Sequence, residues 1–299
     1  MADTEQMAAQ MAGKGGFIAA LDQSGGSTPG ALRQYGIPDD AYHGETEMFG
    51  LIHAMRVRIM TSPAFTGNQV IGAILFEGTM DGAVEGRPTP SYLWQDRGVV
   101  PFVKVDKGLE AEADGVRLMK PMPELDVLLQ RATRLGVYGT KMRSVIEGAS
   151  RAGIAAIVQQ QFDIGRQIAA HGLMPILEPE VSIKAPDKAA AEEILRDEIL
   201  KRLDALDGDG KVMLKLTIPT VSNLYAPLIG HARVQRVVAL SGGYSRHEAC
   251  RLLATNRGMI ASFSRALIDG LRKSLSDTAF DAALREAIDE IYQASVHKA

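Results

Sequence analysis

The 299-residue chain lacks the features of several large protein classes. Cysteine occurs only once, as Cys250, so no disulfide can form within the chain and a reducing compartment is the simplest interpretation. No uninterrupted apolar run approaches the ~20 residues that are needed to span a bilayer. The first residues, 1–5, carry acidic side chains where a secretory signal peptide carries positive charge. We therefore expect a soluble protein of the cytoplasm.

An excess of one charge sign and clustered histidines are also missing. The net charge is −3, from 33 basic and 36 acidic residues, and leaves no basic footprint for nucleic acid. The six histidines, at positions 43, 53, 171, 231, 247 and 297, show no H-x-H or H-x-x-x-H spacing. A zinc site needs such ligands gathered around one ion. We therefore expect neither a metal nor a cofactor.

What the chain does contain is apolar sequence in short runs. Hydrophobic residues make up 46% of it and charged residues 23%, which allows a sizeable core and argues against disorder. Strands are predicted at 17–21, 70–76, 99–105, 137–143, 173–177, 211–218, 236–240 and 258–263. Helices are predicted at 3–12, 46–60, 123–134, 150–171, 189–206 and 277–296, near 245 and after 265. Residues 77–98 are expected to form an irregular polar connection.

This alternation predicts a fold. Eight short strands that mostly alternate with helices indicate a single (β/α)8 TIM barrel over residues 1–299, with extra N-terminal and C-terminal helices. An open doubly wound sheet is the alternative, and it normally has a glycine fingerprint for phosphate directly after its first strand. The glycines of segment 13–16 precede the first strand, which favours a turn.

The predicted strand 211–218 carries a lysine in its middle. Because side chains alternate along a strand, Lys215 shares a face with Met213 and Thr217, while the opposite face is apolar. A lysine is rarely buried unless it is paired or has a function. The alternative is a frayed strand end from which Lys215 reaches water.

Charged side chains also lie near the ends of other predicted strands. In a TIM barrel the chemistry takes place at the carboxyl ends of the strands. Residues spaced i, i+2 share a face, so each charged pair points in one direction. The set consists of Asp22, Lys104, Asp106, Lys141, Arg143, Glu178 and Glu180. We interpret these residues, together with Lys215, as an active site.

An amine among carboxylates and cations suits covalent catalysis through a Schiff base. Desolvation and a neighbouring cation, here Lys141, both favour the uncharged amine, and the carboxylates can move the protons that imine formation requires. After the seventh strand, Ser241, Gly242 and Gly243 offer backbone N–H groups, and after the eighth Arg265 offers a cationic fork. These loops are the usual phosphate pocket of the barrel.

These motifs together resemble the class I fructose-bisphosphate aldolases, of the shorter bacterial kind. The matching stretches are Ala-Ala-Leu-Asp-Gln-Ser-Gly-Gly-Ser at 19–27, Val-Lys-Val-Asp-Lys-Gly at 103–108, Lys-Met-Arg at 141–143, Leu-Glu-Pro-Glu at 177–180, Lys215, Leu-Ser-Gly-Gly at 240–243 and Ser-Phe-Ser-Arg at 262–265. They occur in the order of the family and span the chain from the first strand to the eighth.

The resemblance implies reversible cleavage of fructose 1,6-bisphosphate to dihydroxyacetone phosphate and glyceraldehyde 3-phosphate in glycolysis and gluconeogenesis. We also expect a homo-oligomer that binds neither nucleic acid nor membranes. Lys215 would form the Schiff base, Glu178 would be the general acid/base, Asp22 would assist at the C4 hydroxyl and Lys141 would place the substrate. One phosphate would be bound by Ser241, Gly242, Gly243 and Arg265, near Ser262, and the other by Lys104, Arg143 and Ser27.

The chain departs from the pattern of many relatives at three places, and three rivals stay open. Gln23 follows the aspartate of the first strand where many relatives have a glutamate, although the shorter kind often departs in the same way. Gly30 stands where relatives usually have a basic residue, and the end, 295–299, has no terminal tyrosine of the kind that longer relatives use in proton transfer. The rivals are a zinc-dependent aldolase, another Schiff-base lyase or transaldolase on the same barrel, and a barrel that binds sugar phosphates or proteins without catalysis.

Overall fold

The computed structural model describes residues 2–24, 26 and 28–299, and within them eight parallel strands close into a barrel. The strands are β1 (Phe17–Leu21), β2 (Val70–Leu75), β5 (Val100–Lys104), β7 (Gly139–Ile146), β8 (Met174–Val181), β9 (Val212–Thr217), β10 (Val234–Leu240) and β11 (Ile260–Phe263). They pair in the order β5-β2-β1-β11-β10-β9-β8-β7, and a β5–β7 pairing closes the ring. The predicted TIM barrel is confirmed.

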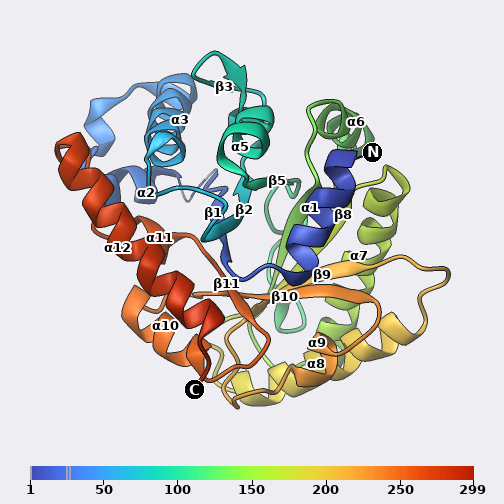
Figure 1. Ribbon diagram of the computed structural model, residues 1–299. Coiled ribbons are helices and arrows are strands. Elements are labelled where there is room, and N and C mark those ends of the chain that lie inside the picture. The colour runs from blue at the N-terminus through green and yellow to red at the C-terminus, as the bar shows by residue number, and fades with distance from the viewer. Residues whose placement is uncertain (1, 25, 27) are drawn as a thin grey trace.

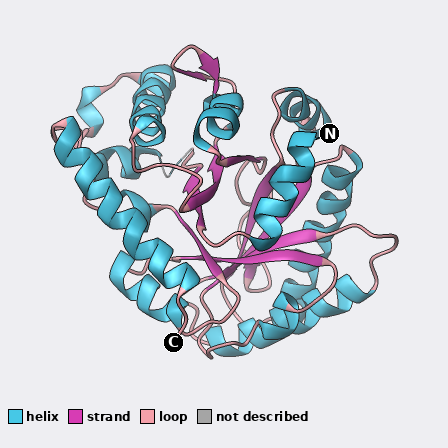
Figure 2. Ribbon diagram, in the orientation of Figure 1, coloured by secondary structure: helices cyan, strands magenta, loops and turns pink. Residues whose placement is uncertain are grey.

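Helices surround the strands on the outside (Figure 2). The helices are α1 (Ala2–Gly13), α2 (Thr28–Tyr35), α3 (Gly44–Thr61), α4 (Glu77–Met80), α5 (Thr89–Arg97), α6 (Leu125–Arg134), α7 (Arg151–Ala170), α8 (Lys188–Asp204), α9 (Ala226–Ile229), α10 (Arg246–Ala254), α11 (Arg265–Ile268) and α12 (Asp277–Val296), with a 3-10 turn at Asp39–Ala41. The predicted extra terminal helices are α1 and α12. No described helix combines the length and apolarity needed to cross a membrane.

The core consists of two apolar clusters separated by the wall of the barrel. On β9, Leu214 and Leu216 belong to the outer cluster, which packs between strands and helices, whereas Met213 belongs to the inner one. This is the predicted alternation, and it turns Lys215 inward. The inner cluster includes Ile18, Phe102, Tyr138, Ile176 and Val238 from other strands. The barrel interior around this inner cluster is therefore packed with side chains and does not form a pore.

Helix α1 lies across the strands at the amino-terminal end of the barrel (Figure 1). Its Met7 and Met11 join the inner cluster. The amide of Gln10 donates hydrogen bonds of 2.8 Å to the carbonyl oxygens of Ile71 and Gly98. Because α1 covers this end, the polar residues inside the barrel are reached from the carboxyl ends of the strands.

The structure corrects three predictions about local structure. Residues 77–98 are not irregular, because they form α4, a hairpin of β3 (Ala83–Val84) and β4 (Arg87–Pro88), and α5. Pro90 stands within the first turn of α5, where its missing N–H costs nothing. Helix α2 has no counterpart among the predicted elements. Strands β7 and β8 extend to residues 146 and 181, so Glu178 and Glu180 lie within a strand and not after it.

Candidate active site

A cavity of about 930 Å³ opens at the carboxyl ends of the strands. Residues of β5, β7, β8, β9, β10 and β11 line it, together with residues that follow β1, β2, β5, β10 and β11 and residues of α2 and α3. Its polar lining includes Asp22, Lys104, Asp106, Lys141, Arg143, Glu178, Glu180, Lys215, Ser241, Ser262 and Arg265. The predicted convergence of charged residues at this end of the barrel is therefore observed.

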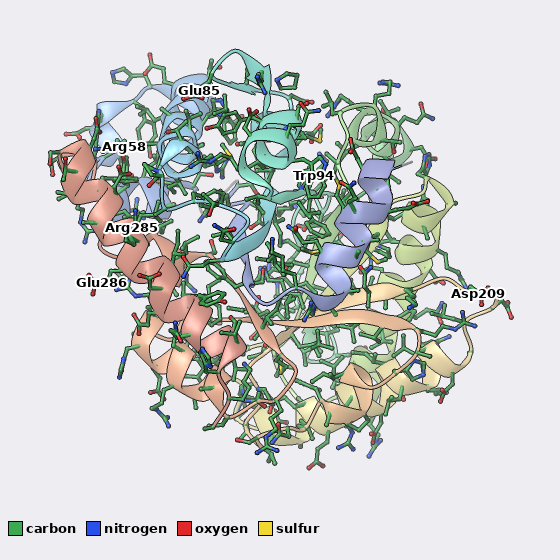
Figure 3. The ribbon with its side chains drawn as sticks, viewed as in Figure 1. Arg58, Glu85, Trp94, Asp209, Arg285 and Glu286 are labelled. Atoms are coloured by element: carbon green, nitrogen blue, oxygen red, sulfur yellow. The ribbon has the colours of Figure 1, made fainter. Side chains whose placement is uncertain are left out.

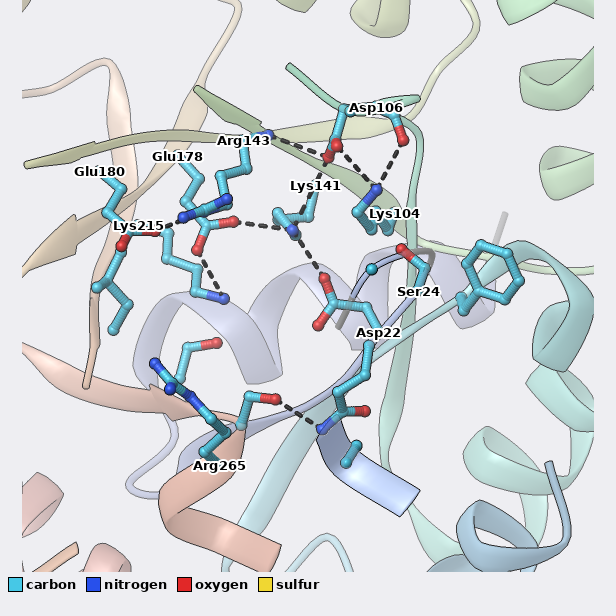
Figure 4. Close-up of a pocket in the computed structure, with 18 of the residues that line it drawn as sticks. Asp22, Ser24, Lys104, Asp106, Lys141, Arg143, Glu178, Glu180, Lys215 and Arg265 are labelled. Atoms are coloured by element: carbon cyan, nitrogen blue, oxygen red, sulfur yellow. Dashed lines mark hydrogen bonds and ion pairs between the residues drawn. The ribbon is translucent and has the colours of Figure 1, made fainter. Parts of the chain in front are cut away.

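Two lysines share one carboxylate at the centre of this cavity (Figure 4). Nζ of Lys215 lies 3.0 Å from Oε1 of Glu178, and Nζ of Lys141 lies 2.9 Å from Oε2 of the same residue. Lys141 also lies 2.7 Å from Oδ2 of Asp22 and 3.9 Å from Asp106. Lys215 is 4% exposed, which excludes the frayed strand end as the reason for its position.

The surrounding charges keep Lys141 and Asp22 ionised. Burial alone would lower the pKa of Lys141, but the carboxylates of Asp22, Glu178 and Asp106 outweigh it and raise this pKa above its ordinary value. Burial alone would raise the pKa of Asp22, and the charges of Lys141 and Lys215 instead hold it well below its usual range. Lys141 is thus a fixed cation, while Lys215 has a proton acceptor in contact with its nitrogen.

Two further ion pairs lie around this centre. Lys104 lies 2.7 Å from Oδ1 of Asp106, and Nε of Arg143 lies 2.5 Å from Oε2 of Glu180. Burial opposes the charge of Arg143, but Glu180 beside it raises its pKa above the ordinary value. Asp106 also accepts a hydrogen bond of 3.1 Å from the backbone N–H of Arg143, which ties the ends of β5 and β7 together. These cations are oriented by carboxylates and remain in the wall of the cavity.

The loop after β10 has the backbone shape of an anion site. Gly242 and Gly243 adopt φ values of 61° and 116°, which favour glycine and can direct consecutive N–H groups to one side. A Cβ atom on Gly242 would lie 2.6 Å from Cγ2 of Ile183, and one on Gly243 would lie 3.5 Å from the guanidinium of Arg265. The arginine and the glycine turn therefore converge on one side of the cavity.

The chain is similar to known proteins over nearly its whole length. It matches the family model for class-I fructose-bisphosphate aldolase over residues 3–218. It is 58% identical over 287 residues to the fructose-bisphosphate aldolase class 1 of Porphyromonas gingivalis, covering 96% of this chain and 97% of that protein. It is also 57% identical over 281 residues to the fructose-bisphosphate aldolase class 1 of a Synechocystis species, and the match covers 94% of each chain. This chain belongs to the class I fructose-bisphosphate aldolase family.

A solved structure supports the fold of this class I aldolase. The fructose-bisphosphate aldolase of Plasmodium falciparum, crystallised with TRAP and a small-molecule inhibitor, superposes with a TM-score of 0.79 over 100% of this chain and 96% of that one. At 19% identity the likeness concerns the architecture alone. Membership of the family makes this chain a carbon–carbon lyase that acts in glycolysis.

The structure places the predicted site residues of this aldolase as follows. Lys215, Glu178, Asp22, Lys141, Ser241, Gly242, Arg265, Arg143, Lys104 and Ser262 line the cavity. Gly243 is absent from the lining but neighbours Arg265. Ser27 lies outside the residues that the structure describes. Within those residues, no group of three or more His, Cys, Asp or Glu side chains is placed to hold a metal ion.

Some residues of the site received no role from the sequence. Asp106 and Glu180 were recognised only as charges near strand ends, and the structure shows that they orient Lys104 and Arg143. The stacked rings of Phe49 and Phe76, 5.4 Å apart, also line the cavity. Their apolar positions within a helix and at a strand end were indistinguishable from ordinary core positions, so no signal in the sequence could have identified them.

Proposed function

We propose that this enzyme cleaves fructose 1,6-bisphosphate reversibly through a Schiff base on Lys215. The observation that carries the proposal is the contact of a buried lysine with a carboxylate, Nζ of Lys215 to Oε1 of Glu178 at 3.0 Å, inside a cavity large enough for a sugar bisphosphate. Family membership supplies the reaction, and this contact supports the assignment of its nucleophile and its acid/base.

Imine formation begins when Glu178 accepts a proton from Lys215 and frees the nitrogen lone pair. The amine attacks C2 of the substrate ketone, and the carbonyl oxygen takes up the proton that the attacking nitrogen gives up, which forms the hydroxyl of a carbinolamine. Glu178, now protonated, returns a proton to that hydroxyl, which leaves as water. The product is a protonated imine, which acts as an electron sink next to C3.

Cleavage breaks the bond between C3 and C4. Glu178 removes the proton of the C4 hydroxyl, and Asp22 orients that hydroxyl. The electrons of the O–H bond form the carbonyl of glyceraldehyde 3-phosphate, and those of the C3–C4 bond enter the enamine. Protonation at C3 and hydrolysis then release dihydroxyacetone phosphate and restore Lys215. Lys141, held between Asp22 and Glu178, keeps both carboxylates in place.

The two phosphates would bind at opposite sides of the cavity. Ser241, Gly242, Gly243 and Arg265 would hold one, with Ser262 beside them. Lys104, Arg143 and Ser27 would contribute to the other, which is supported by the presence of Lys104 and Arg143 in the lining. Because their carboxylate partners already hold Lys104 and Arg143 in place, both cations could bind a phosphate without moving far.

The cellular setting is proposed from the family. A glycolytic enzyme acts in the cytoplasm, so we place this protein there. Organisation of residues 1–299 as one domain stays a prediction, which a single cooperative unfolding transition would support. Assembly into a homo-oligomer also stays a prediction, and the molar mass measured by light scattering would test it.

Reduction with borohydride tests the mechanism. Borohydride added with dihydroxyacetone phosphate should inactivate the enzyme irreversibly, with the added mass on the peptide that contains Lys215. Lys215→Ala should abolish both cleavage and labelling, whereas Lys211→Ala, at an exposed position of the same segment, should change neither. Cleavage by Lys215→Ala, or labelling of another lysine, would overturn the proposal. Activity lost on dialysis against a chelator would favour the zinc-dependent rival instead.

A further inference from the structure

Arg56 of α3 is a buried cation to which the mechanism above gives no role. It is 0% exposed, and no ion pair to it is found within residues 2–24, 26 and 28–299. Burial lowers its pKa to about 10, which still leaves it charged near neutral pH. A buried charge without a carboxylate in contact costs stability, and an apolar side chain of similar length would serve the core better.

The guanidinium of Arg56 instead holds the ends of two neighbouring strands. One nitrogen, Nη2, donates to the carbonyl oxygen of Gln23, directly after Asp22. The other, Nη1, donates to the hydroxyl of Thr79 at 2.7 Å, in the helical turn after β2. Strands β1 and β2 are paired in the barrel, so the fork spans their two carboxyl ends. The group also lies 5.9 Å from the ring centroid of Phe76, which lines the cavity.

Gln23 is held at its side chain as well. Its amide nitrogen donates a hydrogen bond of 2.7 Å to the hydroxyl of Ser264, which precedes Arg265. Gln23, the residue that follows Asp22, is therefore fixed at its backbone carbonyl by Arg56 and at its side chain by the loop after β11. A backbone held in two directions allows Asp22 few orientations.

We propose that Arg56 is a positioning residue that fixes the backbone of Gln23, directly after Asp22, and so aims the Asp22 carboxylate at the substrate. The proposal rests on the proposed function, in which Asp22 orients the C4 hydroxyl for cleavage. Arg56 touches no substrate atom and acts through the backbone. Its charge, which attracts Asp22 across the peptide, works in the same direction as its hydrogen bonds.

The first test compares two arginines of one helix. Arg56→Met should lower kcat for cleavage about 10- to 100-fold, the scale on which small misplacements of a catalytic group act, with little change in KM. The control is Arg58→Met. Arg58, two residues later (Figure 3), donates to the carbonyl oxygen of Leu275 at 2.6 Å and to Asp277 at 2.9 Å. It lies 4.2 Å from the ring of Phe280 and is not among the residues that line the cavity. It should lower the melting temperature but leave kcat unchanged.

The second test separates positioning from loss of structure. Dihydroxyacetone phosphate has no C4, so its imine with Lys215 forms without the hydroxyl that Asp22 orients. Arg56→Met should therefore be labelled by borohydride at the wild-type rate while its cleavage is slow. Arg56→Lys, which keeps the charge but cannot bridge Gln23 and Thr79, should be slow in cleavage too. Should Arg56→Met not fold, Thr79→Val removes one of the two contacts and should lower kcat to a smaller extent.

Two results would overturn the role of Arg56. One is a kcat for Arg56→Met equal to that of Arg58→Met at a temperature where both are folded. The other is a fall in borohydride labelling in proportion to the fall in cleavage, which would mean that the whole site is disturbed. Failure of the wild-type enzyme to be labelled at Lys215 would instead refute the Schiff-base mechanism, so the two failures are distinguishable.

Discussion

The Nζ atom of Lys215 lies 3.0 Å from Oε1 of Glu178, inside the barrel. The other carboxylate oxygen of Glu178 is held at 2.9 Å by Lys141, whose positive charge is stabilised by three carboxylates. The proposed nucleophile, its proposed proton acceptor and a buried cation are thus in consecutive contact. Within the described residues, Lys215 contacts one carboxylate and Lys141 contacts three, which supports the proposal that Lys215 reacts and Lys141 does not.

Replacing Glu178 should slow turnover without preventing substrate binding. Glu178→Gln keeps the shape but cannot accept a proton from Lys215, so kcat should fall about 10²-fold or more, the usual scale for a lost acid/base. Glu193→Gln, on the exposed side of α8, is the matched control. Steady-state cleavage kinetics measure the effect, and a variant with wild-type kcat would show that another group moves these protons.

The inward position of Lys215 could be predicted because it depends on local pattern. Alternation along 211–218 turned the lysine inward, and short apolar runs located every strand of the barrel. The resemblance depends on contiguous motifs such as 177–180, which can be read directly from the sequence. Ion pairs between strands, by contrast, depend on the tilt and register of the barrel, and no local pattern encodes them. The sequence therefore predicts that Asp106 and Glu180 lie near the site, but it does not predict their ion pairs with Lys104 and Arg143.

The burial of Arg56 and the structure of segment 77–98 could not be predicted from the sequence. The apolar spacing of the helix that contains Arg56 predicts which face of the helix is buried. It does not predict that a charged residue is buried there, because the hydrogen-bond acceptors of Arg56 are on Gln23 and Thr79, which are distant in sequence. Segment 77–98 is polar and contains prolines, so composition favoured a loop. Its short helices are stabilised by packing onto the barrel, and the helix propensities of the residues do not include this contribution.

The stability of the enzyme should depend on pH through Asp22. The pKa of this carboxyl is lowered from 3.8, so its ion pair with Lys141 stabilises the fold above pH 3.8 and is lost as the pH falls toward the folded-state pKa. Asp22→Asn should therefore be less stable than wild type at pH 7, and the difference should shrink below pH 3.8. Urea unfolding from pH 7 to 3 measures this difference.

The matched control for Asp22 is a carboxylate in solvent. Asp209, in the exposed loop between α8 and β9, lies 3.8 Å from Arg233, and its side chain is fully exposed (Figure 3). Asp209→Asn should follow the wild-type curve at every pH, because exposed pairs contribute little. An equal stability deficit of Asp22→Asn at pH 7 and pH 3 would contradict the assignment of Asp22 as an ionised partner of Lys141.

Loss of the arginine beside the glycine turn should affect binding and leave the chemistry intact. In the proposed function Arg265 binds a phosphate equally in the ground and transition states. Arg265→Ala should therefore raise KM about 10-fold or more at nearly constant kcat. Arg257→Ala, at an exposed position in the loop before β11, should leave both constants unchanged. A fall in kcat at constant KM would instead assign Arg265 to the reacting end of the substrate.

Two glycines with similar backbone angles separate strain from function. Gly242 has φ 61° and Gly172 has φ 76°, so alanine at either position costs about 1 kcal/mol of conformational strain. A Cβ atom at position 172 meets nothing within 4 Å, whereas at 242 it would lie 2.6 Å from Cγ2 of Ile183, beside the proposed phosphate site. Gly172→Ala should therefore lower the melting temperature alone, by a few degrees. Gly242→Ala should also raise KM, because the turn must shift to relieve the clash, and an unchanged KM would exclude its N–H groups from phosphate binding.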